Sequence, residues 1–264
     1  MYYNNLKHLK FMKLTFKKHL LTLVVVLTVT GFTVAQDLHF GFQASPSWSW
    51  LNTTNAKLNG SGTALGLKLG LIIENRFSEA YSISSGIGFH FNSGGSVRTA
   101  LRGKLWQESY DYFENPPRTQ DTFAKETKLR YSLNYVEIPI GLKMRTAEGG
   151  NHIRWFAEPL LTFGFRSNAK GAVSSAISVP DQEKINIKKE VGGINLSWGL
   201  GAGGEYIISN NTAIVVGLYY QNGFTDVTKD GSIVLFNPAV TSGQQADNSK
   251  GTLKSLTLRL GVMF

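Results

Sequence analysis

The chain has 264 residues, of which 42% are hydrophobic, and a formal net charge of +9. This apolar content is too low for a bundle of membrane-spanning helices. The absence of cysteine excludes a disulfide framework, a cysteine-ligated metal, a cysteine nucleophile and a lipid anchor on cysteine. Five lysines and no acid precede residue 36, so the remaining chain carries only +4. Because that charge is small and dispersed, we expect no nucleic-acid partner.

Residues 1–35 have the three parts of a secretory signal peptide. A basic stretch is followed by an apolar run over residues 20–29, and Ala35 supplies a small residue at the cleavage position. That run is shorter than the roughly 20 residues that a membrane-spanning helix needs. We therefore predict cleavage after Ala35, with Met12 as an alternative start, and a mature domain over residues 36–264. An uncleaved N-terminal anchor helix is the alternative.

Apolar side chains alternate with small or polar ones throughout the mature chain, with the period of two that is typical of β-strands. The last segment shows the pattern best, because Leu256, Leu258 and Leu260 alternate with Thr257 and Arg259. Eight segments follow this rule, namely residues 38–45, 65–74, 81–91, 136–144, 154–165, 194–203, 214–221 and 255–264.

The connections between these segments alternate between short and long. Three are short turns, and four are long, near residues 52–62, 92–128, 167–190 and 222–251. Outer-membrane barrels have short periplasmic turns and longer extracellular loops. The sequence therefore predicts an all-β fold, an eight-stranded antiparallel transmembrane up-and-down β-barrel in the bacterial outer membrane. A soluble secreted β-barrel or sandwich that binds a ligand is the alternative.

Two features interrupt the regular pattern. The apolar positions change from odd to even numbers near Asn134, which predicts a β-bulge there. Pro46, Pro139 and Pro159 lie in or beside predicted strands, where each removes a donor from the hydrogen-bond ladder.

The two faces of the predicted strands differ in character. One face carries large aliphatic and aromatic residues, which we expect to meet lipid. The other carries glycines and charged residues, namely Lys68, Glu137, Lys143, Arg154, Glu158, Glu205 and Arg259. Side chains fill the interior of an eight-stranded barrel. We therefore predict that these charges form an ion-pair network in the lumen; solvated charges on a soluble sandwich are the alternative.

The segment Tyr135 to Lys143, with the sequence YVEIPIGLK, resembles a strand signature of the PorT-like outer-membrane β-barrel family. Phe264 at the end of an alternating strand resembles the C-terminal signal that the barrel-insertion machinery reads, and the junction after Ala35 resembles signal ends in that family. The resemblance implies an eight-stranded barrel in a Gram-negative envelope, with outer-membrane lipid and the insertion machinery as partners. It implies no activity.

The favoured function is a non-enzymatic structural or binding role in the cell envelope. The loop over residues 92–128 is the expected surface for an extracellular or envelope protein, because it carries Trp106, Tyr110, Tyr112, Phe113 and Phe123. A mobile solvated loop is the alternative for this segment. A small pore or a secretion-associated component is the second candidate function.

An enzyme is the third candidate function, and the sequence offers little for it. Only His39, His90 and His152 remain after signal removal, and His90 is expected near the outer rim of the barrel. No nucleophile elbow, paired zinc histidines or phosphate loop accompanies them. We therefore expect no catalytic site, cofactor or metal.

Overall fold

The computed structural model describes residues 38–54, 57–114, 122–174, 181–209, 211–236, 239, 243–246 and 248–264. The signal peptide and its cleavage site at Ala35 lie outside the described residues and stay predictions. In the part of the chain that is described, no helix has both the length and the apolar character that crossing a membrane requires.

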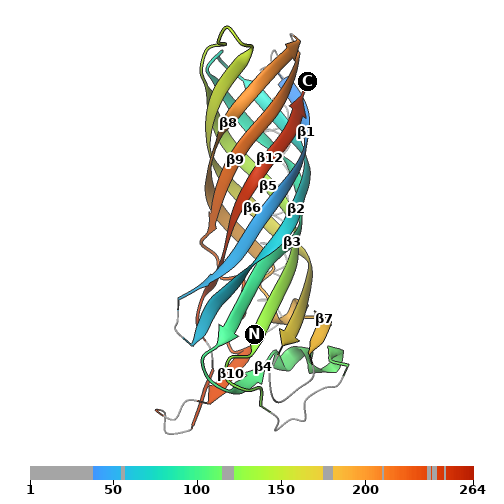
Figure 1. Cartoon of the computed structure of the whole chain (residues 1–264), viewed down its shortest axis with the longest axis vertical. Coiled ribbons are helices and arrows are strands. Elements are labelled where there is room, and N and C mark those ends of the chain that lie inside the picture. The colour runs from blue at the N-terminus through green and yellow to red at the C-terminus, as the bar shows by residue number, and fades with distance from the viewer. Residues whose placement is uncertain are drawn as a thin grey trace, which may run out of the picture. The chain divides into compact units, whose positions relative to one another are not determined.

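Eight long antiparallel strands form a closed barrel, which confirms the predicted fold (Figure 1). They are β1 (Leu38–Thr53), β2 (Leu58–Arg76), β3 (Tyr81–Thr99), β5 (Lys128–Arg145), β6 (Ile153–Ser174), β8 (Ile194–Ser209), β9 (Thr212–Gly223) and β12 (Gly251–Met263). Each strand pairs with the next barrel strand along the chain, and β1 pairs with β12 to close the ring.

Large apolar side chains cover the outside of the barrel. On β2, Leu65 and Leu71 are 60% and 49% exposed, whereas Lys68 and Glu74 between and beside them are buried. A soluble barrel has the opposite arrangement, with apolar residues inside and charges in water. An outer surface of this kind fits lipid, so a soluble ligand binder does not match the fold.

The three strand prolines lie where the ladders are interrupted. Pairing between β1 and β12 breaks around Pro46, where the backbone N–H of Leu260 donates instead to Ser45 Oγ at 3.3 Å. The β3–β5 ladder breaks beside Pro139, and the β5–β6 ladder breaks beside Pro159. The missing proline donors therefore coincide with gaps that the sheet already accommodates.

The register shifts beside Asn134, but the extra residues belong to the neighbouring strands. β5 itself alternates without a break, with odd-numbered residues facing inward along its whole length. The additional residues lie in β3 near Asn92, whose φ is 53°, and in β6 at Ser167. The irregularity predicted beside Asn134 is therefore present, but the extra residues lie in β3 and β6 and not in β5. On the side of Asn134 that is nearer the cap, the apolar residues of β5 occupy its inner face. This is why the apolar positions change from odd to even numbers in the sequence.

Beyond this level the strands continue further than the sequence predicts. β3 reaches Thr99 and β6 reaches Ser174, although loops were expected from residues 92 and 167. Here Leu129, Tyr131 and Leu133 of β5 point inward and are buried. The outward positions of the same segments carry exposed cations, namely Arg98, Arg130 and Lys170. With an apolar interior and a charged exterior, this part is organised like a soluble protein and lies outside lipid.

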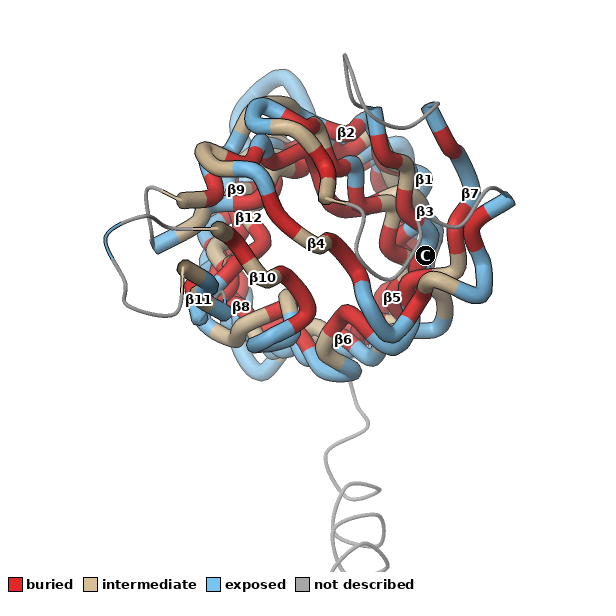
Figure 2. Tube along the Cα trace, turned by 90° about the horizontal axis from the view of Figure 1, so that it is seen from below, coloured by how far each residue is buried: buried red, intermediate tan, exposed pale blue. Residues whose placement is uncertain are grey.

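Short elements from the long connections close this end of the barrel. They are β4 (Gly103–Leu105), the 3-10 helices η2 (Gln107–Tyr112) and η3 (Lys188–Glu190), β7 (Gln182–Asn186), β10 (Ile233–Phe236) and β11 (Gln244–Ala246). Seen end-on, β4 crosses the barrel opening (Figure 2). We call these elements, together with the strand ends around them, the cap.

The cap has its own hydrophobic core, which takes up most of the large aromatics of residues 92–128. Trp106, Phe113 and Phe123 are buried in that core, and only Tyr112 among the large aromatics of this segment is well exposed. Trp106 Nε1 donates to the Tyr131 hydroxyl at 3.2 Å. The aromatics predicted as a binding surface therefore hold the described part of this segment in place, and it is not a solvated loop.

Candidate functional site

Charged side chains fill the barrel lumen at three levels, and the first lies near the short turns. Lys143 Nζ donates to Glu74 Oε1 at 2.6 Å and also pairs with Glu205. Arg145 Nε donates to Glu205 Oε2 at 2.8 Å, and its guanidinium also pairs with Glu74. Two cations thus bridge two carboxylates, and all four groups are buried. Such a group is tolerated only when every charge has partners.

The middle level is centred on Glu158 of β6. Its carboxylate accepts from Ser84 Oγ at 2.5 Å, from Arg259 Nη1 at 3.0 Å and from the Tyr219 hydroxyl. The Arg259 guanidinium lies 3.7 Å from the centre of the Tyr219 ring. Gly141 makes this possible, because a Cβ there would lie 2.8 Å from Glu158 Oε1.

The third level lies closer to the cap. Lys68 Nζ donates to Glu137 Oε2 at 2.9 Å and also to the side chain of Gln221. His90 Nδ1 lies 3.1 Å from Glu137 Oε1. Gln221 Nε2 in turn donates to Thr162 Oγ1 at 2.8 Å. Lys68 is on β2 and Gln221 on β9, which are not neighbours in the sheet, so these contacts cross the lumen.

The structure brings together most of the residues predicted to share the lumen network. Those that take part are Lys68, Glu137, Lys143, Glu158, Glu205 and Arg259. Arg154 does not, because it lies at the end of β6 and its Nη2 contacts Glu148 at 3.4 Å. Arg154 is still paired with Glu205 of β8, but its side chain lines the open end of the barrel, where Glu148 of the short turn reaches it. This part of the prediction is wrong.

Sequence reasoning missed two members of the first level and misplaced a histidine. Glu74 and Arg145 share the inward parity of Lys68 and Lys143, so strand parity alone could have found them. They were missed because both lie at the ends of predicted strands. His90 was expected at the rim, but β3 continues past it and the imidazole is buried inside the barrel.

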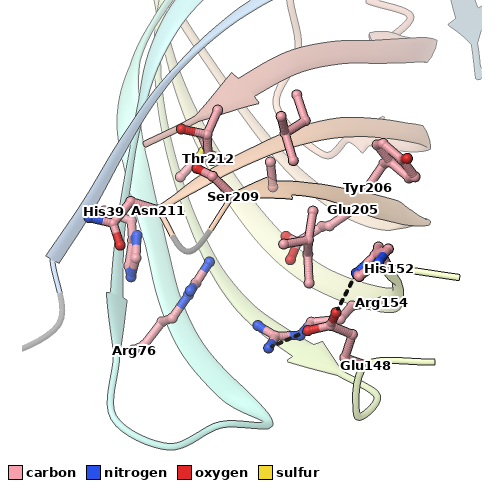
Figure 3. Close-up of a pocket in the computed structure, with 14 residues that line it drawn as sticks. His39, Arg76, Glu148, His152, Arg154, Glu205, Tyr206, Ser209, Asn211 and Thr212 are labelled. Carbon is pink, nitrogen blue, oxygen red and sulfur yellow. Dashed lines mark hydrogen bonds and ion pairs between the residues drawn. The ribbon is translucent and has the colours of Figure 1, made fainter. Parts of the chain in front are cut away.

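A charged mouth opens at the short-turn end of the barrel (Figure 3). It encloses a cavity of about 600 Å³. His152 Nδ1 lies 3.0 Å from Glu148 Oε1, and His39 Nδ1 lies 3.2 Å from the carbonyl oxygen of Phe264. Among the residues that the structure describes, no group of three or more histidines or carboxylates is placed to hold a metal. The mouth therefore offers ion pairs and hydrogen bonds.

Several solved structures are similar to this chain. A major outer membrane protein from Thermus thermophilus has 13% identity and a TM-score of 0.41, with 87% of this chain and 99% of that chain covered. Ail, the attachment invasion locus protein of Yersinia pestis, has 11% identity and a TM-score of 0.34, with coverage of 87% and 100%. The outer membrane protease OmpT from Escherichia coli has 11% identity and a TM-score of 0.32, with coverage of 87% and 96%.

A search of curated proteins returned no significant match. The family model of the outer membrane protein beta-barrel domain matches residues 34–229, which is most of the chain. This match agrees with the closed eight-stranded barrel and its apolar outer surface. The chain therefore belongs to the outer membrane protein beta-barrel domain family, and its location is the bacterial outer membrane.

Proposed function

We propose that the protein is a non-enzymatic scaffold of the outer membrane, in which the barrel anchors a rigid cap that binds a partner outside the cell. The supporting observation is the hydrophobic core of the cap, in which Trp106, Leu105 and Ile187 are fully buried. Such a core holds surface segments in one conformation, and a preorganised surface loses less entropy on binding than a mobile loop does. The longer connections of such barrels face the exterior.

The surface that we assign to the partner is the outer side of η2. Tyr112 is 47% exposed there, and Asp111 beside it is also exposed. Glu108 is held by Lys229, whose Nζ lies 2.9 Å from both of its carboxylate oxygens. An exposed tyrosine on a rigid support next to acidic groups is the kind of residue that anchors protein interfaces.

Site-specific photocrosslinking on intact cells tests this assignment. A photoreactive residue at position 112 is expected to give a discrete crosslinked product, and the same residue at the exposed position 224 is expected to give none. The product is expected to disappear when Trp106→Ala removes the support of η2 in a barrel that still inserts. A product that persists with Trp106→Ala, or the absence of any product at position 112, contradicts the proposal.

A pore is the second candidate function, and the lumen argues against it. Side chains cross the interior at three levels, and an eight-stranded barrel has little space beyond them. We expect the purified protein to give no steady ion conductance in planar bilayers. A steady conductance that Glu158→Gln alters would instead support transport through the lumen.

We also propose that the protein is a member of the PorT-like group within its family. The resemblance of residues 135–143 to the PorT-like group supports membership of that group, but no residue matched here supports a role in secretion. Phe264 at the end of the chain supports assembly by the barrel-insertion machinery. The environment of His90 supports a non-enzymatic role. Its buried ring contacts Glu137, and Lys68 donates to the same carboxylate, so this histidine belongs to the ion-pair network of the lumen.

A further inference from the structure

A group of cations lies on one outer side of the barrel, between the lipid-facing surface and the top of the cap. They come from β3, β5, β6 and β7, and they are Arg98, Lys128, Arg130, Lys170 and Lys184. In the described part of the chain none of them forms an ion pair within 4.0 Å. Two acids lie nearby, namely Glu183, which lines the same hollow as Lys184, and Asp181, which is bonded to Ser174 opposite Lys128. On β1, β2, β8, β9 and β12, Lys254 is the one outward cation above the lipid-facing surface in the described residues. On the barrel strands, most of the outward positive charge of this region therefore lies on one side.

Strand pairing forces these like charges together. Arg98 of β3 is directly opposite Lys128 of β5, and both side chains point outward. Arg130 is two residues further along the same face, and Lys170 of β6 is opposite Ser132. Like charges directly opposite each other destabilise a sheet. An anion shared between them would remove that cost.

A hollow at the centre of this group is suited to an anion. It has a volume of about 150 Å³, and its polar lining consists of three cations, one acid and two uncharged residues, namely Arg130, Lys170, Lys184, Glu183, Asn92 and Ser132. The fork of an arginine matches the oxygens of a phosphate, and the lysines add point charges and donors. The hollow therefore has the charge and the donors that a phosphate requires.

The short distance between these cations and the lipid-facing surface favours a lipid headgroup over a soluble phosphate. The stacked rings of Phe89 and Phe91 lie on the lipid-facing side of β3, and Phe165 lies on that of β6. Lys170 is five residues beyond Phe165, which is roughly 12 Å of height for a strand tilted by about 45°. Long lysine and arginine side chains can reach down to the headgroup layer from there. We propose that this face binds the phosphate-bearing headgroup of an outer-leaflet lipid, whose acyl chains lie against the phenylalanines.

Native mass spectrometry of the full barrel, released from detergent with added lipid, tests this proposal. The probes are lipid A carrying its phosphates and the same lipid after their removal. The triple variant Arg130→Gln, Lys170→Gln, Lys184→Gln is expected to lose about tenfold in affinity for the phosphorylated lipid. The matched control Lys189→Gln, Lys250→Gln, Lys254→Gln removes the same charge elsewhere and is expected to bind normally.

Three results would overturn the proposal. One is equal binding by the triple variant and the wild type, when both show the gel shift of a folded barrel. Another is equal binding of the two lipid probes, which would mean that the acyl chains alone are recognised. The third is complete competition by inorganic phosphate at the concentration of the lipid, which would make this a site for soluble anions.

Discussion

At the scale of single residues, the lumen shows how charges can lie inside a membrane protein. Moving a charge from water into the protein interior is costly, and the cost is recovered only when hydrogen bonds satisfy it. Glu158 accepts from Ser84, Arg259 and Tyr219, so its carboxylate is fully engaged. Removing its charge would leave Arg259 buried without a carboxylate.

We therefore expect Glu158→Gln to destabilise the barrel by about 3 kcal/mol, in the range for breaking a buried ion pair. The measurement is the midpoint of thermal unfolding in detergent, followed by the mobility of the unboiled protein on a gel. Glu148→Gln is the matched control, because Glu148 lies on the exposed rim and contacts His152 and Arg154 only there. An unchanged midpoint for Glu158→Gln would show that the network adds nothing to stability.

The carboxyl group of Glu190 in the cap is buried, which is unfavourable for its charged form. Burial raises the pKa of Glu190 above its ordinary value, and the charge of Glu108 pushes the pKa in the same direction, while Ser109 and Lys229 oppose the shift. The folded cap therefore holds this proton at a pH where the unfolded chain has released it. The contribution to stability is greatest below the ordinary glutamate pKa and falls as pH rises above it.

Glu190→Gln should therefore make the cap more stable at neutral pH and have little effect in mild acid below the ordinary glutamate pKa. Resistance of the cap to limited proteolysis, measured from acid to neutral pH in a detergent that keeps the barrel folded, reports the difference. Glu183→Gln, on the exposed side of β7, is the control. A variant that is less stable than the wild type at neutral pH would contradict this reasoning.

At the scale of elements, strand alternation was readable from the sequence and strand length was not. Leu65 to Ile73 and Leu256 to Leu260 place their apolar faces as predicted. The parts of β3 and β6 that lie next to the cap resemble loops in the sequence, because bulges at Asn92 and Ser167 reverse the alternation of apolar and polar residues there. In β5 the parity is continuous, but the apolar residues move from the outer to the inner face. The alternation of apolar residues looks the same when a bulge shifts the strand and when the apolar face changes from outside to inside. It therefore does not show whether lipid or water surrounds the strand.

The charged residues of the lumen could likewise be predicted only in part. Parity correctly places charges in mid-strand, such as Lys68 and Glu158. It fails at strand ends, where Arg154 lines the open mouth and pairs with Glu148. It also misses Arg145, which lies just beyond the predicted strand. The cap could not be predicted because its core joins distant segments. Trp106 packs against Tyr131 with ring centres 5.3 Å apart, and nothing in the local sequence around either residue records the other.

The cap core gives a prediction at this scale. Trp106→Ala should cost the cap about 4 kcal/mol, as expected for truncating a large buried aromatic, while the barrel within lipid stays folded. Protease added to intact cells should then cut the segments around η2, and the unboiled barrel should still migrate as a folded species. Tyr112→Ala is the matched control, because that ring is exposed. Equal protease resistance of Trp106→Ala and the wild type would mean that the core does not hold η2.

At the scale of the whole molecule, one continuous barrel passes through two solvents. In the part next to the short turns large apolar residues face outward, and the interior is held by ion pairs such as Lys143 with Glu74. In the part next to the cap the interior is apolar, and short elements of the cap cover it (Figure 2). The boundary between the two parts lies at Asn92, Asn134 and Ser167, where the strands change register.

One measurement tests directly whether the apolar faces of the barrel next to the short turns point outward into lipid. Inner and outer membranes are separated from cells, and the protein is run on a detergent gel with and without boiling. We predict a band in the outer-membrane fraction that migrates faster when it is not boiled, because a closed barrel held by ladders and buried ion pairs resists the detergent. A soluble periplasmic band with no shift would contradict the account, because it would mean that the apolar faces point inward.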